Sequence, residues 1–269
     1  MKKIYSLQSK FLLLMLSTTL LYSCDPFLYL PDPYLVADSR QKENVYYAPP
    51  CQNVPLLSEK NDLSGSLSFG STSKQSGVDV HSAFMPAKNF GLLGSYRSYK
   101  QKSNSVEGKI SSYEFGAGYI KDDKKLHLEV YGGIGGGQIT NTHHSGLSTV
   151  KFNNFFIQPT IAVQNLEKTV QFAFVSRFSS LHFKVGDTTY KNAREPFVTS
   201  QLKLINDNPG RIFWEPGVVL RAGAKNVLLE IAFSVTDDLS KGSFAMDKTN
   251  ISFGLIFKGN VGNNNSKAK

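Results

Sequence analysis

Apolar side chains recur at every second position of this sequence, in blocks of about ten residues that begin near residue 61. Because successive side chains of a strand point to opposite faces of a sheet, this period predicts β-strands with one apolar face. Groups of turn-forming residues separate the blocks. The pattern predicts roughly eleven strands and no helix. The apolar rows are Leu63, Leu67, Phe69; Val78, Val80, Phe84; Phe90, Leu92, Tyr96; Tyr113, Phe115, Ala117, Tyr119; Leu126, Leu128, Val130, Ile134; Phe155, Ile157, Ile161, Val163; Val170, Phe172, Phe174, Phe178; Val198, Leu202, Leu204; Ile212, Trp214, Val218, Leu220; Val227, Leu229, Ile231, Phe233, Val235; and Ile251, Phe253, Leu255, Phe257.

The opposite face of these strands is polar or small and carries several charges. A meander of amphipathic strands predicts an all-β fold, a single antiparallel barrel of about 10–12 strands. In an outer-membrane barrel the apolar face meets lipid, whereas in a soluble barrel it faces inward, and alternation alone leaves both open. The ionisable residues of the polar phase are Asp79, His81, Arg97, Glu114, His127, Glu129, Arg177, Glu215, Arg221 and Glu230.

The connections favour the outer-membrane type, because such barrels alternate short periplasmic turns with long outer loops. The predicted short turns are residues 86–89, 121–124, 164–168 and 206–211, and the long loops are residues 100–109, 140–149 and 184–195. The alternation then fails, since 222–226 is short where a long loop is due and 236–249 is long. An odd number of strands also fits a closed meander poorly. One strand is therefore missed or split into two, and Val45 to Tyr47 is a candidate.

The N-terminus predicts export and anchoring. Lys2, Lys3 and Lys10 precede an apolar stretch at residues 11–21, which is too short to span a bilayer but has the length found in signal peptides. The residues "LYSC" that follow resemble the bacterial lipobox. The resemblance implies a signal peptide over residues 1–23 and an acylated Cys24 that anchors the protein in membrane lipid. The alternative is an ordinary secretory signal that leaves Cys24 to pair with Cys51.

Three further segments follow from the pattern. Residues 24–60 are rich in Pro and Tyr and show no period, which predicts an extended, lipidated tether. Residues 61–258 form the barrel domain, and residues 259–269 form a disordered polar tail. With 19 Phe and 12 Tyr, the composition favours strands.

Charge narrows the choice of partners. The chain carries 30 basic and 21 acidic residues, a net charge of +9. Because the basic residues form no cluster, we expect no nucleic-acid partner. The glycine run at 131–137 lacks the following helix of a phosphate loop, so strand glycines in a curved sheet explain it better. His143 and His144 lie in a predicted loop without metal-ligand spacing, so we expect no metal and no cofactor.

A catalytic role is the weaker interpretation of the inward charges. If the barrel were an enzyme acting on envelope lipid or peptide, His127 with Asp79 or Glu129 would be the natural catalytic group. Charges of opposite sign within a narrow barrel instead predict a lumen filled by ion pairs. Trp214 fits either an interfacial aromatic belt or a packed core.

Several segments together resemble a family of Bacteroidetes-type lipoproteins that form outer-membrane β-barrel-like domains and have no known function. They are "YYAPPCQNVPLL", "YEFGAGYI", "LEVYGGIGGG", "FFIQPTIAVQ" and "EPGVVLRAGAKNVLLEIAFS". The resemblance implies a lipid-anchored barrel in the outer membrane and carries no catalytic residues. We therefore expect a non-catalytic, structural or surface-interaction role, with lipopolysaccharide or surface partners contacting the long loops. The alternatives are a lipid-tethered soluble barrel that binds an apolar ligand, and the enzyme described above.

Overall fold

The computed structural model describes residues 45–102, 106–123, 125–143, 146–189, 196–240 and 244–262. All of them belong to one compact unit, Ala37–Lys269. The predicted signal peptide, Cys24 and residues 263–269 of the predicted tail lie outside the described residues. Among those that are described, no helix has the length and apolar composition needed to cross a bilayer.

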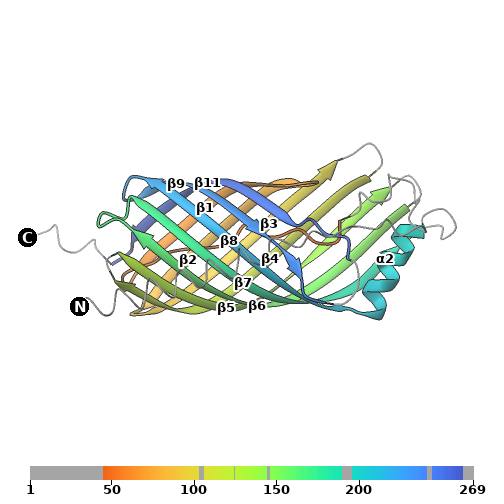
Figure 1. Ribbon diagram of the computed structural model, residues 1–269, viewed down its shortest axis with the longest axis horizontal. Coiled ribbons are helices and arrows are strands. Elements are labelled where there is room, and N and C mark those ends of the chain that lie inside the picture. The colour runs from red at the N-terminus through yellow and green to blue at the C-terminus, as the bar shows by residue number, and fades with distance from the viewer. Residues whose placement is uncertain are drawn as a thin grey trace, which may run out of the picture. The chain divides into compact units, whose positions relative to one another are not determined.

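The described chain forms a closed antiparallel barrel (Figure 1). Consecutive strands pair from β1 to β8, and β1 pairs with β11, β11 with β9 and β9 with β8, which closes the cylinder. The sheet contains eleven strands, but β10 pairs only with two residues of β8, which leaves ten in the barrel. The strands are β1 Asp62–Thr72, β2 Ser76–Ala87, β3 Phe90–Lys102, β4 Val106–Asp123, β5 Leu126–His143, β6 Gly146–Gln164, β7 Val170–Thr188, β8 Gly210–Gly223, β9 Val227–Val235, β10 Asp237–Asp238 and β11 Thr249–Asn260.

The prediction of a strand at Val198 to Leu204 was wrong, because this segment is helix α2, Pro196–Asp207. Val198 and Ile205 are fully buried and Leu202 is half-buried, a spacing of four and three residues that places them on one face of a helix. The step of four from Val198 to Leu202 fits one face of a strand as well as one face of a helix, which is why the row resembled a strand. Val45 to Tyr47 do not form a strand either.

This single error accounts for both faults in the predicted meander. Without α2 the barrel has an even number of strands, and residues 189–209 become one long connection between β7 and β8. The short turn at 224–226 and the long connection at 236–248 then fall where alternation requires them. The barrel extends from Asp62 to Asn260, so β11 continues two residues into the predicted tail.

The two ends of the barrel differ. The end that carries the turns β2–β3, β4–β5, β6–β7 and β8–β9 is called here the short-turn end. The opposite end, with α2 and the described residues 236–240 and 244–248, is called the mouth (Figure 1). Most of the predicted long loops 100–109 and 140–149 are strand, because β3 to β6 continue almost to their turns at the mouth. The barrel wall therefore extends further at the mouth than the sequence indicated.

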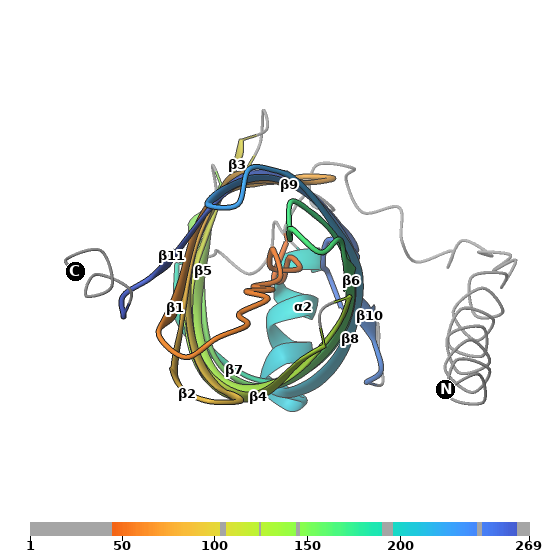
Figure 2. The same cartoon turned by 90° about the vertical axis from the view of Figure 1, so that its left-hand side faces the viewer.

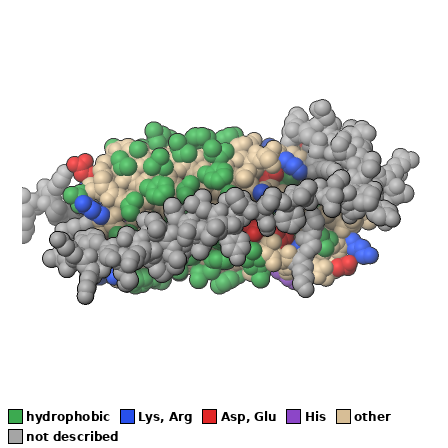
Figure 3. All heavy atoms as spheres, viewed as in Figure 1, with side chains coloured by type: hydrophobic (Ala, Val, Ile, Leu, Met, Phe, Trp, Pro, Cys, Tyr) green, Lys and Arg blue, Asp and Glu red, His purple; other side chains and the backbone are tan. Residues whose placement is uncertain are grey.

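The apolar phase of the strands faces outward near the short-turn end and lies in an exposed belt (Figure 3). On β6 the belt runs from Val163 to Phe155, a separation of eight positions, or about 20 Å along the axis for strands tilted by about 40°. Water does not tolerate so large an apolar surface, but a bilayer core matches it. The exposed belt residues include Leu67, Phe69, Val80, Leu92, Tyr96, Tyr113, Phe115, Tyr119, Val130, Ile134, Ile157, Phe172, Phe178, Leu220, Leu229, Ile231, Phe253 and Leu255.

Toward the mouth the polarity of the wall reverses. The outer positions become polar and exposed there, while the inner positions are apolar and join one buried cluster. On β6 the reversal falls between outward Phe155 and outward Asn153. The buried inner residues are Ile110, Ile139, Val150, Phe152, Leu181 and Phe183. The exposed outer residues are Lys109, Gln138, Lys151, Asn153, His182 and Lys184.

The reversal decides between the two barrels that the sequence left open. Every predicted apolar row of the barrel strands places its members on the outer face, so the alternative of a soluble barrel with that phase inside is wrong. Buried apolar clusters do occur inside the barrel, both at the mouth and in the short-turn half, but residues of the opposite phase and of the luminal side form them. A wall that is apolar outside in one half and polar outside in the other is typical of a barrel that spans a membrane and projects beyond it.

Candidate functional site

Residues 45–57, called here the luminal segment, lie inside the barrel (Figure 2). All of them are buried. The segment runs from the mouth, where the Tyr46 amide donates to the Ala245 carbonyl at 2.8 Å, toward the short-turn end, where the Lys258 ammonium donates to the Leu56 carbonyl at 3.2 Å. This part of the predicted tether is therefore a packed interior element, while residues 24–44 lie outside the described residues.

Side chains of the wall bind the backbone of the luminal segment. A buried backbone without strand partners needs other donors and acceptors. Arg97 donates to the Ala48 carbonyl at 2.6 Å, and Gln158 donates to the Asn53 carbonyl at 2.8 Å. Asn250 donates to the Pro49 carbonyl at 2.9 Å and Arg221 to the Val54 carbonyl at 2.5 Å. The prolines at 49, 50 and 55 lack an N–H, which reduces the number of buried donors to satisfy.

A charge cluster in the middle of the lumen joins the segment to three strands. The Arg177 guanidinium donates to both carboxylate oxygens of Glu114, at 2.5 and 2.9 Å, and lies 3.1 Å from Glu215. Tyr47 of the luminal segment and Ser179 donate to the two oxygens of Glu215, at 2.5 and 2.6 Å. The prediction that inward charges pair with one another is confirmed here, and Arg221 with Glu230 repeats it at 2.6 Å.

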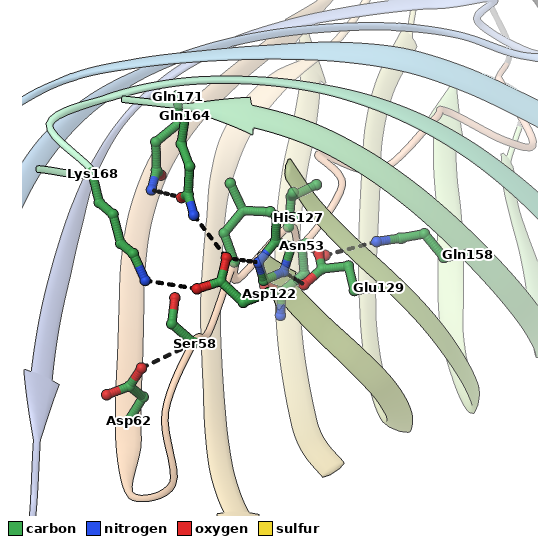
Figure 4. A network of polar contacts seen from close by, with 12 residues as sticks. Asn53, Ser58, Asp62, Asp122, His127, Glu129, Gln158, Gln164, Lys168 and Gln171 are labelled. Atoms are coloured by element: carbon green, nitrogen blue, oxygen red, sulfur yellow. Dashed lines mark hydrogen bonds and ion pairs between the residues drawn. The ribbon is translucent and has the colours of Figure 1, made fainter. Parts of the chain in front are cut away.

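A second polar network lies near the short-turn end (Figure 4). Asp122 accepts hydrogen bonds from Lys168 and Gln164, each at 2.8 Å, and lies 3.2 Å from Nδ1 of His127. The other ring nitrogen of His127 lies 3.2 Å from Glu129. The sequence interpretation included His127 and Glu129 but missed Asp122, Lys168 and Gln164, because these stand at strand ends and in turns where alternation carries no information.

Of the residues suggested for catalysis, the structure brings His127 and Glu129 together but pairs Asp79 with a different residue. Both ring nitrogens of His127 contact carboxylates, so neither is left to activate a nucleophile. Asp79 accepts a hydrogen bond from Tyr99 at 2.6 Å. A Ser–His contact does occur, between Ser95 and Nδ1 of His81 at 3.0 Å. The cavity beside His81 is about 10 Å³, room for one water molecule and too small for a substrate.

The structure describes one of the two cysteines and most of the side chains that could ligate a metal ion. Cys51 is a free, buried thiol in the luminal segment, 3.1 Å from the Ser252 hydroxyl. Cys24, the predicted lipidation site, lies outside the described residues. In the part of the chain that the structure describes, no three His, Cys, Asp or Glu side chains form a group that could hold a metal ion.

The mouth is closed by apolar packing. Phe244, from the connection between β9 and β11, lies 5.2 Å from Phe183 between ring centroids. The Tyr47 ring stacks on Phe213 at 4.5 Å, and Ile205 of α2 joins the same cluster. Trp214 lies half-buried on the outer face beside Phe178 at 6.5 Å, which fits the belt position considered from sequence. The luminal segment and the residues of the mouth thus fill the interior together.

No protein-family model and no curated protein matches this chain. Among solved structures, it is similar to the translocator domain of the autotransporter NalP from Neisseria meningitidis, with 11% identity over 75% of this chain and 88% of that one, at a TM-score of 0.43. It is also similar to Neisserial surface protein A, with 10% identity over 73% and 94% of the two chains and a TM-score of 0.36. The attachment invasion locus protein Ail of Yersinia pestis shows 10% identity over 75% and 100%, at 0.31. At this level of similarity no residue role transfers to this chain.

Proposed function

We propose that this protein is a lipid-anchored outer-membrane β-barrel with a closed lumen and a non-catalytic role, either in envelope structure or in surface interaction at the mouth. The observation that carries the proposal is the reversal of polarity along the wall. The belt near the short-turn end fits hydrocarbon, and the polar outer face toward the mouth fits the aqueous side. The packed interior favours a structural or binding role over a pore.

The course of the luminal segment supports placing the lipid anchor in the membrane leaflet nearer the mouth. Val45 lies at the mouth, where its carbonyl accepts a hydrogen bond from Asn141 at 3.4 Å, so the preceding residues join the barrel there. Twenty extended residues from Cys24 would reach about 70 Å, enough to return to the nearer leaflet. Reaching the farther leaflet would draw a polar backbone through hydrocarbon. With short turns facing the periplasm, acylated Cys24 would lie in the outer leaflet.

The anchor and the barrel can be tested separately. Wild type and Cys24→Ala are labelled with an alkyne analogue of palmitate and fractionated, and each is run on SDS gels with and without heating. We expect label only on the wild type, and a heat-dependent shift in mobility together with resistance to carbonate extraction for both. Labelled Cys24→Ala would contradict the anchor, and release of Cys24→Ala by carbonate would contradict the spanning barrel.

The predicted side of the anchor has its own test. An epitope inserted between residues 38 and 39 is compared in intact cells with the same epitope in the β6–β7 turn, residues 165–169. We expect antibody to bind the first epitope in intact cells and the second only after the outer membrane is permeabilised. The reverse pattern would place the mouth in the periplasm.

A further inference from the structure

Four exposed lysines stand on the outer face of the wall just beyond the apolar belt, in the half nearer the mouth. Lys100, Lys109 and Lys151 each lie four residues nearer the mouth than the last outward apolar residue of their strand, about 10 Å along the axis. Lys184 lies six residues beyond Phe178 on β7. The girdle that these four form therefore lies at the level where the polar headgroups of a bilayer begin.

The register places the girdle lysines in directly opposed pairs. Lys100 is the cross-strand partner of Lys109, and Lys151 is the partner of Lys184. Like charges at opposed positions of neighbouring strands destabilise a sheet. Among the described residues none of the four lysines takes part in an ion pair, and the exposed carboxylate of Glu107 stands one outward position nearer the rim than Lys109. No carboxylate stands directly opposite any of the four lysines, so an anionic group from outside the protein would relieve the repulsion within each pair.

We propose that the girdle, Lys100, Lys109, Lys151 and Lys184, binds the phosphate groups of phosphorylated lipid headgroups in the leaflet next to the mouth. The proposal rests on the spanning barrel proposed above. Phosphate oxygens between two opposed ammonium groups would turn a repulsive pair into two attractive contacts. A lysine stem is long and flexible, so the charged ends can reach toward the headgroup plane from these positions. Lys100, Lys109 and Lys184 fall within residue ranges that the sequence predicted as long loops, but the structure places all four lysines on strands.

The test compares phosphorylated and dephosphorylated glycolipid on the refolded barrel. Full-length protein in a zwitterionic detergent is titrated with bisphosphorylated lipid A, with enzymatically dephosphorylated lipid A and with inorganic phosphate, and binding is followed by native mass spectrometry. Each lysine near an anionic surface contributes about a fivefold change in affinity. We therefore expect K100Q/K109Q and K151Q/K184Q each to weaken bisphosphorylated lipid A binding about 25-fold. Dephosphorylated lipid and free phosphate should bind weakly to every form.

Two controls make the outcome specific. K121Q/K225Q removes two exposed lysines at the short-turn end and should leave lipid A binding unchanged within about twofold. Without anionic lipid, the girdle variants should unfold at the same or a higher temperature than wild type, because they relieve repulsion. Unchanged binding in the girdle variants, or equal loss in the control variant, would overturn the proposal. Heat-dependent gel mobility of each variant reports separately whether the barrel itself forms.

Discussion

The location of the membrane along the wall predicts how one substitution should behave at two positions of the same strand. Ile157 and Asn153 both point outward from β6, and both are exposed. Ile157 lies within the apolar belt, and Asn153 lies just past its edge, four residues toward the mouth. Replacing each with lysine therefore adds the same charged side chain to the same face at two depths.

The expected difference follows from the solvent at each depth. A lysine on the lipid face of a barrel costs about 2–4 kcal/mol near the bilayer midplane and about 0–1 kcal/mol near the interface. Ile157 is two residues inside the belt edge at Phe155, so Ile157→Lys should lose about 2 kcal/mol of unfolding free energy, near the lower end of the midplane range. Asn153→Lys should change it by about 0–1 kcal/mol. In water, an exposed substitution at either position would change stability by about 0.5 kcal/mol or less.

The assay is reversible urea unfolding of the barrel in phospholipid vesicles, followed by tryptophan fluorescence. Trp214, the single tryptophan, lies on β8 beside Phe178 of β7. Strand β7 separates it from β6, the substituted strand. Equal losses at the two positions would refute the proposed membrane boundary. Small losses at both would refute the spanning barrel itself.

Four other predictions test the interior. Arg177→Met removes the cation between two buried carboxylates and should destabilise the barrel by about 3–5 kcal/mol in the same urea assay; a loss below about 1 kcal/mol would mean that the cluster is hydrated. Ile205→Ala opens a cavity between α2 and the mouth and should lower the free energy of unfolding by about 2–5 kcal/mol in that assay. An unchanged free energy of unfolding would mean that α2 does not pack stably on the barrel. Cys51 is buried, so in a Cys24→Ala background a maleimide should label it slowly in the folded protein and completely after heating in SDS; fast labelling of unheated protein would mean that the luminal segment leaves the barrel. Deleting residues 45–57 should produce steady ion conductance in planar bilayers, whereas wild type should remain silent, and a conducting wild type would contradict the closed lumen.

Local alternation predicted much of the fold because the two faces of a strand in a membrane barrel lie in different environments, lipid outside and the lumen inside. The rows such as Tyr113, Phe115 and Tyr119 all lie on one face, and the inward charges such as Arg177 and Glu215 all lie on the other. The two-residue period is misleading where an apolar spacing fits a helix as well as a strand. At Val198 to Leu204 a mixed spacing concealed α2, and that one error disturbed both the strand count and the order of the loops.

The candidate site was predictable in composition but not in arrangement. The sequence identified Glu114, Arg177 and Glu215 as lumen-facing, since each has the polar phase of its strand. Which charges meet depends on the register of strands that lie far apart in the chain. Asp122 and Lys168 stand 46 positions apart and pair at 2.8 Å only because β4, β5, β6 and β7 lie side by side.

The sequence by itself determined the strand class, the amphipathic phase and the prediction of a processed, acylated N-terminus, because each of these depends on neighbours a few residues apart. Only the tertiary structure decided which phase faces outward, where the polarity reverses and where residues 45–57 lie. Closure of the barrel creates an inside, and an aperiodic, Pro-rich segment has no period that could indicate it. The wall supplies the hydrogen bonds that such a segment cannot make with itself, and so the lumen becomes its place in the fold.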